Sequence, residues 1–356
     1  MLVFKNIYSR MCALCKFFMT KNFNKMVTIA IILAFLFIFS YFFFVRLPSL
    51  NGFSCGQCGY FEDDTRFLKC EFGYARYHKG EESSYDHLGS VRKINVETDH
   101  LARRVYGIDQ SANSNTLSIF SGCSFVFGVG LDADETLPYL FSNISRKRSM
   151  NLGTAGGGLH SVHRLVDLLT PDELGGDKEA IFYYVFISDH LNRWHRRASY
   201  LSWGLPVHPT YDIVKRHAAY AGPLCERFSF KVKEFFKAIN LNNFGLKLLN
   251  MIYPMDKFSD EDLDNFAQGV VSLKQKISEK KPNFKFHFVF HPLTSPLHGN
   301  LYNLNEKLRK AGISTVHFNN FFPDHIDPKL LQLKDKHPSG LVNKLLAEWF
   351  IKFENK

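Results

Sequence analysis

One serine and an acid–histidine pair are the residues of this chain best suited to covalent chemistry. Ser124 lies within Ser121-Gly-Cys-Ser-Phe-Val-Phe-Gly-Val-Gly130, directly after a short apolar run. Asp335 and His337 are two positions apart near the C-terminus, and such residues project to the same side of an extended segment. A histidine that is oriented by a carboxylate can take the proton of a serine hydroxyl. These residues therefore predict a serine-hydrolase site.

Each of the two segments also has a plain structural interpretation. The first can be a glycine-rich turn from a strand to a helix, with Ser124 as the helix cap. It is not the Gly-x-Ser-x-Gly nucleophile elbow, because position 126 is Val126. The second can be an exposed polar loop with one ordinary histidine.

A third glycine-rich segment, Asn151-Leu-Gly-Thr-Ala-Gly-Gly-Gly158, follows another apolar run. Such a loop can bring backbone N–H groups close to a ligand. It lacks the Gly-Lys-Ser/Thr ending of a phosphate-binding P-loop, and its spacing is not Gly-x-Gly-x-x-Gly. It is therefore a weak candidate for a nucleotide site.

Together the three segments resemble the SGNH (GDSL-like) hydrolase family over about 117–350. The segment around Ser124 resembles the block with the nucleophile, and Asn151 through Gly156 resembles the second block. Asp335-Lys-His-Pro resembles the final block. The resemblance implies Ser124 as nucleophile, His337 as base and Asp335 as its partner. It also implies that the backbone N–H groups of Ser124 and Gly156 stabilise the oxyanion.

Two positions depart from the family pattern. Cys123 stands where the family usually has aspartate, which affects packing more than chemistry. The third block usually reads Gly-x-Asn-Asp, whereas this chain has Ile187-Ser-Asp-His190. Asp189 thus falls at the oxyanion asparagine, and an ionised carboxylate cannot donate a hydrogen bond. Either Asp189 is protonated, or His190 is the donor, or the oxyanion hole is reduced. Asp189→Asn would speed ester hydrolysis if the donor is missing, and would do little if His190 is the donor.

Short apolar runs that alternate with helical stretches predict an α/β fold, a three-layer flavodoxin-like domain around a parallel sheet. The expected strands are Leu117–Phe120, Met150–Leu152, Ala180–Ile187, Phe286–Phe290 and Ser314–Phe318. The expected helices are Thr136–Ser142, Leu159–Leu169, Asp260–Glu279, Leu301–Lys310 and Leu341–Phe353. In such sheets the chemistry lies beyond the carboxyl ends of the strands, which is where the three segments fall.

Four regions follow from this pattern: a tail at 1–25, a membrane anchor at 26–46, an accessory segment at 47–115 and the hydrolase-like domain at 116–356. Within the accessory segment we expect a strand at Val91–Val96. The interval from about 196 to 257 fits the strand–helix alternation poorly and is interpreted as an insertion over the site.

The stretch Met26–Val45 holds twenty residues without a charge, long enough as a helix to cross a bilayer. Five basic and no acidic residues precede it, which predicts a cytoplasmic N-terminus and an exported domain, most simply on the periplasmic side of a bacterial inner membrane. A cleaved signal peptide is the alternative, but its apolar region would be shorter and end at small residues. We therefore expect a single-pass membrane protein.

The net charge of +10 comes largely from the basic residues around the expected membrane anchor, which set its orientation. Six of the 44 basic residues fall in positions 1–46, so the rest of the chain holds 38 basic and 34 acidic residues. This balance does not indicate a nucleic-acid partner. On the exported side a disulfide between two of Cys55, Cys58 and Cys70 is expected, with Cys123 buried and unpaired.

Other histidines have simpler interpretations. His160 and His163 are close enough on a helix to bind a metal, but no carboxylate partner is evident, so no metal or cofactor is expected. His291 ends an expected strand and is a candidate for substrate contact.

The sequence thus favours a membrane-anchored serine esterase, or an O-acyltransferase, that acts on an acylated small molecule, envelope glycan or lipid. The alternative is a non-catalytic carbohydrate-binding protein that retains the fold but has lost the oxyanion donor at Asp189. Both interpretations require a pocket, and retention of all three triad residue types favours the enzyme.

Overall fold

The computed structural model describes residues 79–99, 103–104, 115–197, 200–201, 208–224, 227, 247, 250, 258–294, 299–318 and 321–355. All of these belong to the second of two compact units, Cys58–Lys356. The expected tail, membrane anchor and disulfide cysteines lie outside the described residues. Within the described residues, no helix combines the length and the apolar character needed to cross a bilayer.

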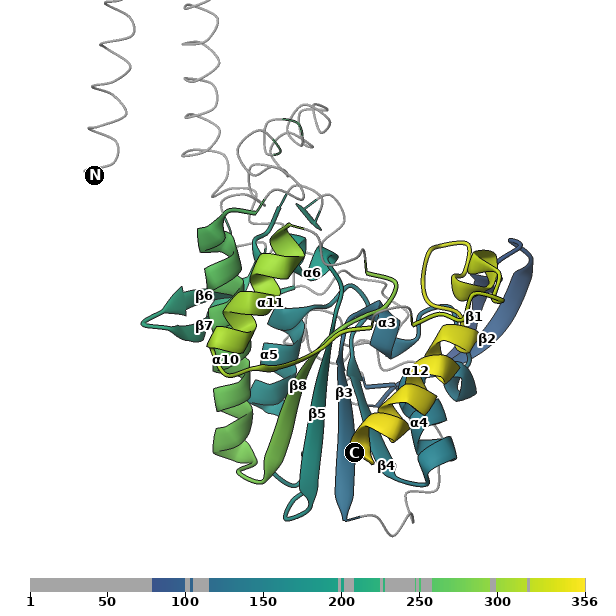
Figure 1. The fold of residues 1–356 in the computed structure, drawn as a ribbon, viewed down its shortest axis with the longest axis horizontal. Coiled ribbons are helices and arrows are strands. Elements are labelled where there is room, and N and C mark those ends of the chain that lie inside the picture. Colours follow the sequence, from purple (N-terminus) through teal and green to yellow (C-terminus); the bar gives the residue numbers. More distant parts are fainter. Residues whose placement is uncertain are drawn as a thin grey trace, which may run out of the picture. The chain divides into compact units, whose positions relative to one another are not determined.

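Five parallel strands form the central sheet, in the spatial order β4-β3-β5-β8-β9 (Figure 1). They are β3 (Thr116–Gly122), β4 (Arg148–Gly153), β5 (Glu179–Phe186), β8 (Phe284–Phe290) and β9 (Ser314–Val316). If these five strands are numbered 1 to 5 in chain order, their spatial order is 2-1-3-4-5, which is the order of flavodoxin-like folds. The prediction of a flavodoxin-like parallel sheet is confirmed.

Helices bury both faces of this sheet and make the three expected layers (Figure 1). One face packs against α5 (Leu159–Leu168), α10 (Asp260–Lys280) and α11 (Asn300–Lys310), and the other against α4 (Leu137–Ser145) and α12 (Gly340–Glu354). Along β5, Phe182 and Tyr184 enter the first core, whereas Tyr183 and Val185 enter the second. This alternation follows from the two-residue period of a strand, and it explains why β5 is apolar or aromatic at nearly every position.

The expected strands and helices are all present, with small differences at their ends. The last strand pairs with β8 only from Ser314 to Val316, opposite His287 to Val289. Ser259 begins α10 with the expected capping box, in which its hydroxyl accepts the Asp262 N–H.

The interval that fits the alternation poorly contains a hairpin of β6 (Pro209–Val214) and β7 (His217–Pro223). This hairpin packs on the helical layer of α5 and α10. Tyr211 lies in the same core as these helices, and the Ala218 N–H donates to Ser272 Oγ at 2.8 Å. The described part of the interval therefore extends the helical layer, and most of the remainder lies outside the described residues.

A second antiparallel hairpin, β1 (Lys79–Tyr85) with β2 (Val91–Glu97), comes from the accessory segment. The expected strand at Val91–Val96 is thereby confirmed. Ile94 and Val96 are buried, whereas Val91 and Lys93 are exposed, so one face of the hairpin is covered.

A buried carboxylate joins the last helix to the sheet. Glu354, whose side chain is 1 % exposed, accepts hydrogen bonds from Tyr183 Oη at 2.9 Å and Ser118 Oγ at 2.8 Å. Lys147 Nζ lies 3.0 Å from its other oxygen. Because α12 directly follows the segment with Asp335 and His337, these contacts help to hold that segment in place.

We expect Glu354→Ala to lower the free energy of unfolding by roughly 2–3 kcal/mol, because it leaves buried hydroxyls and an ammonium group without their acceptor. Urea denaturation measures this change. Lys344→Ala, at an exposed position of the same helix, is the matched control and should stay within about 0.5 kcal/mol of the parent. Equal effects of the two substitutions would contradict the role of Glu354.

Candidate active site

Ser124 lies where β3 ends and a short helix, α3 (Ser124–Phe127), begins. The chain can turn there because Gly122 has φ of +151°, and a Cβ at this position would come within 2.6 Å of the Val185 carbonyl oxygen on the next strand. Ser124 is 7 % exposed, and Cys123 before it is fully buried and free, as expected. The serine is therefore placed at the carboxyl edge of the sheet.

Asp335 and His337 lie in the loop between η5 (Pro328–Leu331) and α12. The carboxylate of Asp335 accepts the His337 backbone N–H at 3.1 Å, and its other oxygen lies 2.8 Å from His337 Nδ1. The contact at Nδ1 does not meet the criteria for a hydrogen bond, and it is an ion pair only when the ring is protonated. His337 is thus oriented by a carboxylate from its own loop.

This loop is a tight turn rather than the expected extended segment. Lys336 has φ of +69°, in the left-handed region, and the Leu333 N–H donates to the His337 carbonyl at 2.8 Å. The turn still brings the two side chains together, because the backbone reverses between them. The expected geometry was wrong, but the expected proximity of Asp335 and His337 is present.

The ring of Phe125 joins the serine segment to the histidine loop. It contacts the His337 ring, with centroids 5.8 Å apart, and the His291 ring, with centroids 4.9 Å apart. Since Phe125 directly follows Ser124, the first and last blocks of the sequence lie side by side at one edge of the sheet, although more than two hundred positions separate them.

His291, the candidate for substrate contact, ends β8 beside Phe125. Its Nδ1 accepts the Leu293 N–H at 3.2 Å, so the neutral ring carries its proton on Nε2. Burial lowers the pKa of His291 to about 3, which keeps the ring neutral at ordinary pH. His291 is therefore a fixed N–H donor next to the serine segment.

The glycine-rich loop after β4 packs directly on the serine segment. A Cβ at Gly153 would come within 2.3 Å of the Phe127 nitrogen, so the two backbones are in contact. Asn151 strengthens this contact, because its side-chain amide donates to the Val126 carbonyl at 3.0 Å and its oxygen accepts the Gly153 N–H at 2.9 Å. Backbone donors of the loop are thus held beside Ser124.

The loop forms a tight turn around the expected oxyanion donor. The Gly157 N–H donates to the Thr154 carbonyl at 2.9 Å, and Gly156 between them has φ of +68°. A glycine in the left-handed region at the third position is typical of a type II turn. The Thr154 N–H donates to the Gly122 carbonyl at 3.2 Å, which ties the turn to the end of β3.

Asp189 and His190 open helix α6 (Asp189–Trp194) at the end of β5, and their side chains go to different partners. Asp189 Oδ2 lies 2.7 Å from both Nε and Nη2 of Arg193, four residues further along the helix. His190 is fully buried, and its Nδ1 lies 2.7 Å from Tyr184 Oη. Burial lowers the pKa of His190 well below its ordinary value, so the ring is neutral.

The Asp189 carboxylate is paired with a neighbouring cation, and the three possibilities for the oxyanion stay predictions. The guanidinium of Arg193 lies against the Asp189 carboxylate. Sequence reasoning did not predict this pair, although the spacing of four residues between Asp189 and Arg193 on a helix was a signal for it.

His160 and His163 do not converge on one point. His163 Nε2 lies 2.9 Å from the Gly269 carbonyl oxygen, whereas His160 lies near Tyr200 Oη at 3.4 Å. Within the part of the chain that the structure describes, no group of three or more His, Cys, Asp or Glu side chains is arranged to hold a metal ion.

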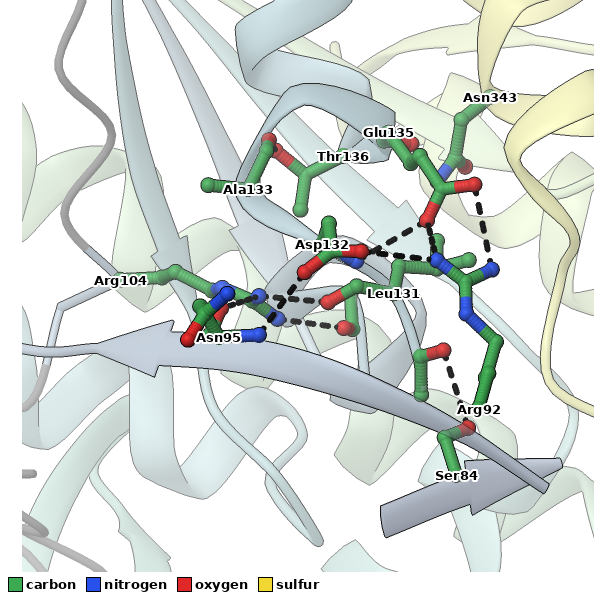
Figure 2. A network of polar contacts seen from close by, with 12 residues as sticks. Ser84, Arg92, Asn95, Arg104, Leu131, Asp132, Ala133, Glu135, Thr136 and Asn343 are labelled. Carbon is green, nitrogen blue, oxygen red and sulfur yellow. Dashed lines mark hydrogen bonds and ion pairs between the residues drawn. The ribbon is translucent and has the colours of Figure 1, made fainter. Parts of the chain in front are cut away.

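The accessory hairpin holds the segment that follows the serine, which sequence reasoning missed (Figure 2). Arg92 of β2 forms ion pairs with Asp132 and Glu135, with the Asp132 pair at 3.0 Å. Arg104 is 3 % exposed and donates to the carbonyls of Gly128 at 2.6 Å and Leu131 at 2.5 Å. These contacts fix the chain between α3 and α4.

The same hairpin contacts the loop with the acid and the base. The Lys334 N–H donates to the Asp86 carbonyl at 3.2 Å, and Lys334 Nζ lies 5.2 Å from the centre of the Tyr85 ring. Asn343 of α12 donates to the Glu135 carbonyl at 3.0 Å (Figure 2). The hairpin therefore joins the segment after the serine to the histidine loop.

The sheet order defines a flavodoxin-like three-layer α/β fold, with the three blocks of the sequence at the carboxyl edge of its sheet. No protein-family model matches the sequence, and no curated protein matches it. Solved structures do match, including an acetyl xylan esterase from the rumen bacterium Butyrivibrio proteoclasticus with a TM-score of 0.38 and 10 % identity. That match covers 74 % of this chain and 66 % of the other, so the chain spans just under two thirds of the esterase's length.

Two further structures are similar at the same level. A protein described as lipolytic and of the G-D-S-L family, from Desulfitobacterium hafniense, has a TM-score of 0.34 and 13 % identity, over 67 % of this chain and 99 % of the other. A family two carbohydrate esterase from Clostridium thermocellum has a TM-score of 0.35 and 9 % identity, over 75 % and 68 %. At these identities and TM-scores the matches do not indicate the activity of this chain, which must be argued from its own residues.

If the blocks build one site, Ser124 Oγ and the free ring nitrogen of His337 should lie about 2.6–3.2 Å apart once an organophosphonate occupies the serine. A crystal structure of that adduct measures the distance. A separation beyond about 8 Å, with the histidine loop well ordered, would contradict the triad, because proton transfer needs hydrogen-bond reach.

Proposed function

We propose that this chain is a serine esterase, or an O-acyltransferase, of the SGNH type. The observation that supports this most is the close contact of the Asp335 carboxylate with His337 Nδ1, in a turn beside the segment that begins with Ser124. A histidine with a carboxylate at Nδ1 has its other nitrogen available as a base. The contact of the His337 ring with Phe125, the residue after Ser124, supports this assignment.

In this mechanism Ser124 Oγ attacks the carbonyl carbon of an ester while His337 takes the hydroxyl proton. The N–H groups of Ser124 and Gly156 donate to the oxygen that becomes negative. The C–O bond of the ester then breaks, and His337 returns the proton to the departing alcohol. Water, or a sugar hydroxyl in a transferase, attacks the acyl-serine in the same way and releases the acyl group.

The exported location is part of the proposal and rests on the charge-free stretch Met26–Val45 with its basic N-terminal flank. An enzyme held at the outer face of a membrane meets acylated glycans and lipids of the envelope. We therefore propose an acylated envelope glycan or lipid as the substrate class.

The direct test is turnover of 4-nitrophenyl acetate by the full-length chain in detergent. We expect Ser124→Ala and His337→Ala each to reduce kcat by about 10³-fold or more, because nucleophile and base act as one unit. The matched control is His325→Ala, an exposed histidine in the same C-terminal part of the chain, which should leave kcat unchanged.

Turnover that survives Ser124→Ala would exclude the proposed mechanism. A folded parent without turnover that still binds acylated glycans would instead support the non-catalytic carbohydrate-binding protein.

Topology has its own test, in cells whose outer envelope has been permeabilised. Added protease should digest an epitope tag at the C-terminus and spare one at the N-terminus, because the basic flank keeps the N-terminus in the cytoplasm. Protection of the C-terminal tag with digestion after full lysis would reverse the proposed orientation.

A further inference from the structure

Arg193 is a buried cation that connects two parts of the candidate active site. The residue is 7 % exposed, and its guanidinium lies 2.7 Å from Asp189 Oδ2 through Nε and through Nη2. Its remaining terminal nitrogen donates to the Gly157 carbonyl oxygen. One side chain therefore holds a carboxylate at the end of β5 and a carbonyl of the glycine-rich turn after β4.

The second contact fixes the free end of that turn. The turn runs from Thr154 to Gly157, and the Thr154 N–H is already bonded to Gly122 at the end of β3. Arg193 holds the opposite end through the Gly157 carbonyl. With both ends fixed, the central peptide before Gly156 keeps one orientation, and in a type II turn the N–H of that peptide belongs to the third residue, here Gly156.

The first contact neutralises a charge close to the nucleophile. Arg193 and Asp189 both act electrostatically on the Cys123 thiol, the residue before Ser124, in opposite directions. A Cβ at Gly158 would lie 3.6 Å from Arg193 Cδ, so the arginine stem passes directly beneath the turn. Without the guanidinium, the carboxylate of Asp189 would oppose negative charge that develops at this edge of the sheet.

Neighbouring groups do not replace this cation. Burial lowers the pKa of His160 and of His190 well below ordinary values, so both rings are neutral. Burial also raises the pKa of Tyr184, which remains a neutral phenol. Arg193 is therefore the cation in direct contact with Asp189.

We propose that Arg193 is a positioning residue of the ester-cleaving site, which holds the Asp189 carboxylate away from the oxyanion and fixes the turn so that the Gly156 N–H faces it. This inference rests on the proposed function. It also changes the expectation for Asp189→Asn: since the carboxylate is already neutralised, removing its charge gains little.

The test uses the full-length chain in detergent and the acetyl ester assay. Arg193→Gln leaves the carboxylate without its cation, and we expect kcat to fall by about 10²-fold with little change in KM. Adding Asp189→Asn to that variant removes the repelling charge and should restore kcat by about tenfold. The matched control is Arg196→Gln, three residues after Arg193. This variant loses an ion pair to Asp212 and should keep the parental kcat.

Each outcome decides the matter. A kcat of Arg193→Gln within about twofold of the parent overturns the proposal. A folded double variant without recovery of kcat also overturns it, because a purely structural role of Arg193 would not depend on the charge at position 189. If Arg193→Gln fails to fold, Asp189→Asn decides: a change of kcat within about threefold supports the proposal, and an increase near 10²-fold overturns it. A parent whose turnover survives Ser124→Ala refutes the esterase proposal instead.

Discussion

The burial of both faces of the parallel sheet is the constraint on which the rest of this structure depends. Because α5, α10 and α11 cover one face and α4 and α12 the other, polar chemistry can lie only beyond the strand ends. Strands β3, β4, β5 and β8 end at the same edge, and the loops that follow them hold the serine, the glycine-rich turn, Asp189 and His291. The last loop brings His337 to the same edge because α12 packs beside α4.

Around this edge, the long-range polar contacts tie loops together rather than strengthen the core. Arg92 and Arg104 join the accessory hairpin to the chain after the serine, and Lys334 joins it to the loop with His337. At the same edge, Arg193 joins α6 to the turn after β4. Rigid support of this kind matters for catalysis, since displacements of about 1 Å in a catalytic group can cost about 10²-fold in rate.

Local patterns in the sequence predicted the sheet, the helices and the strand-end position of Ser124, because apolar runs and turn residues report short-range structure. They did not predict the left-handed Lys336, since a lysine gives no sign of that conformation. The contacts of Arg92 and Arg104 depend on residues about 24 to 43 positions away, so they emerge only once the chain is folded. From the sequence, Asp189 is a missing hydrogen-bond donor at the oxyanion position. Its contact with Arg193 became evident only from the geometry.

The central claim is that Ser124 is a nucleophile activated by His337. The most direct measurement is the rate of covalent labelling by a fluorophosphonate, followed by mass spectrometry of the intact full-length chain and of its peptides. We expect a single phosphonyl group on Ser124 in the parent, labelling slowed by about 10³-fold in His337→Ala, and none in Ser124→Ala. A folded parent that stays unlabelled, or that is labelled on another residue, would contradict the claim.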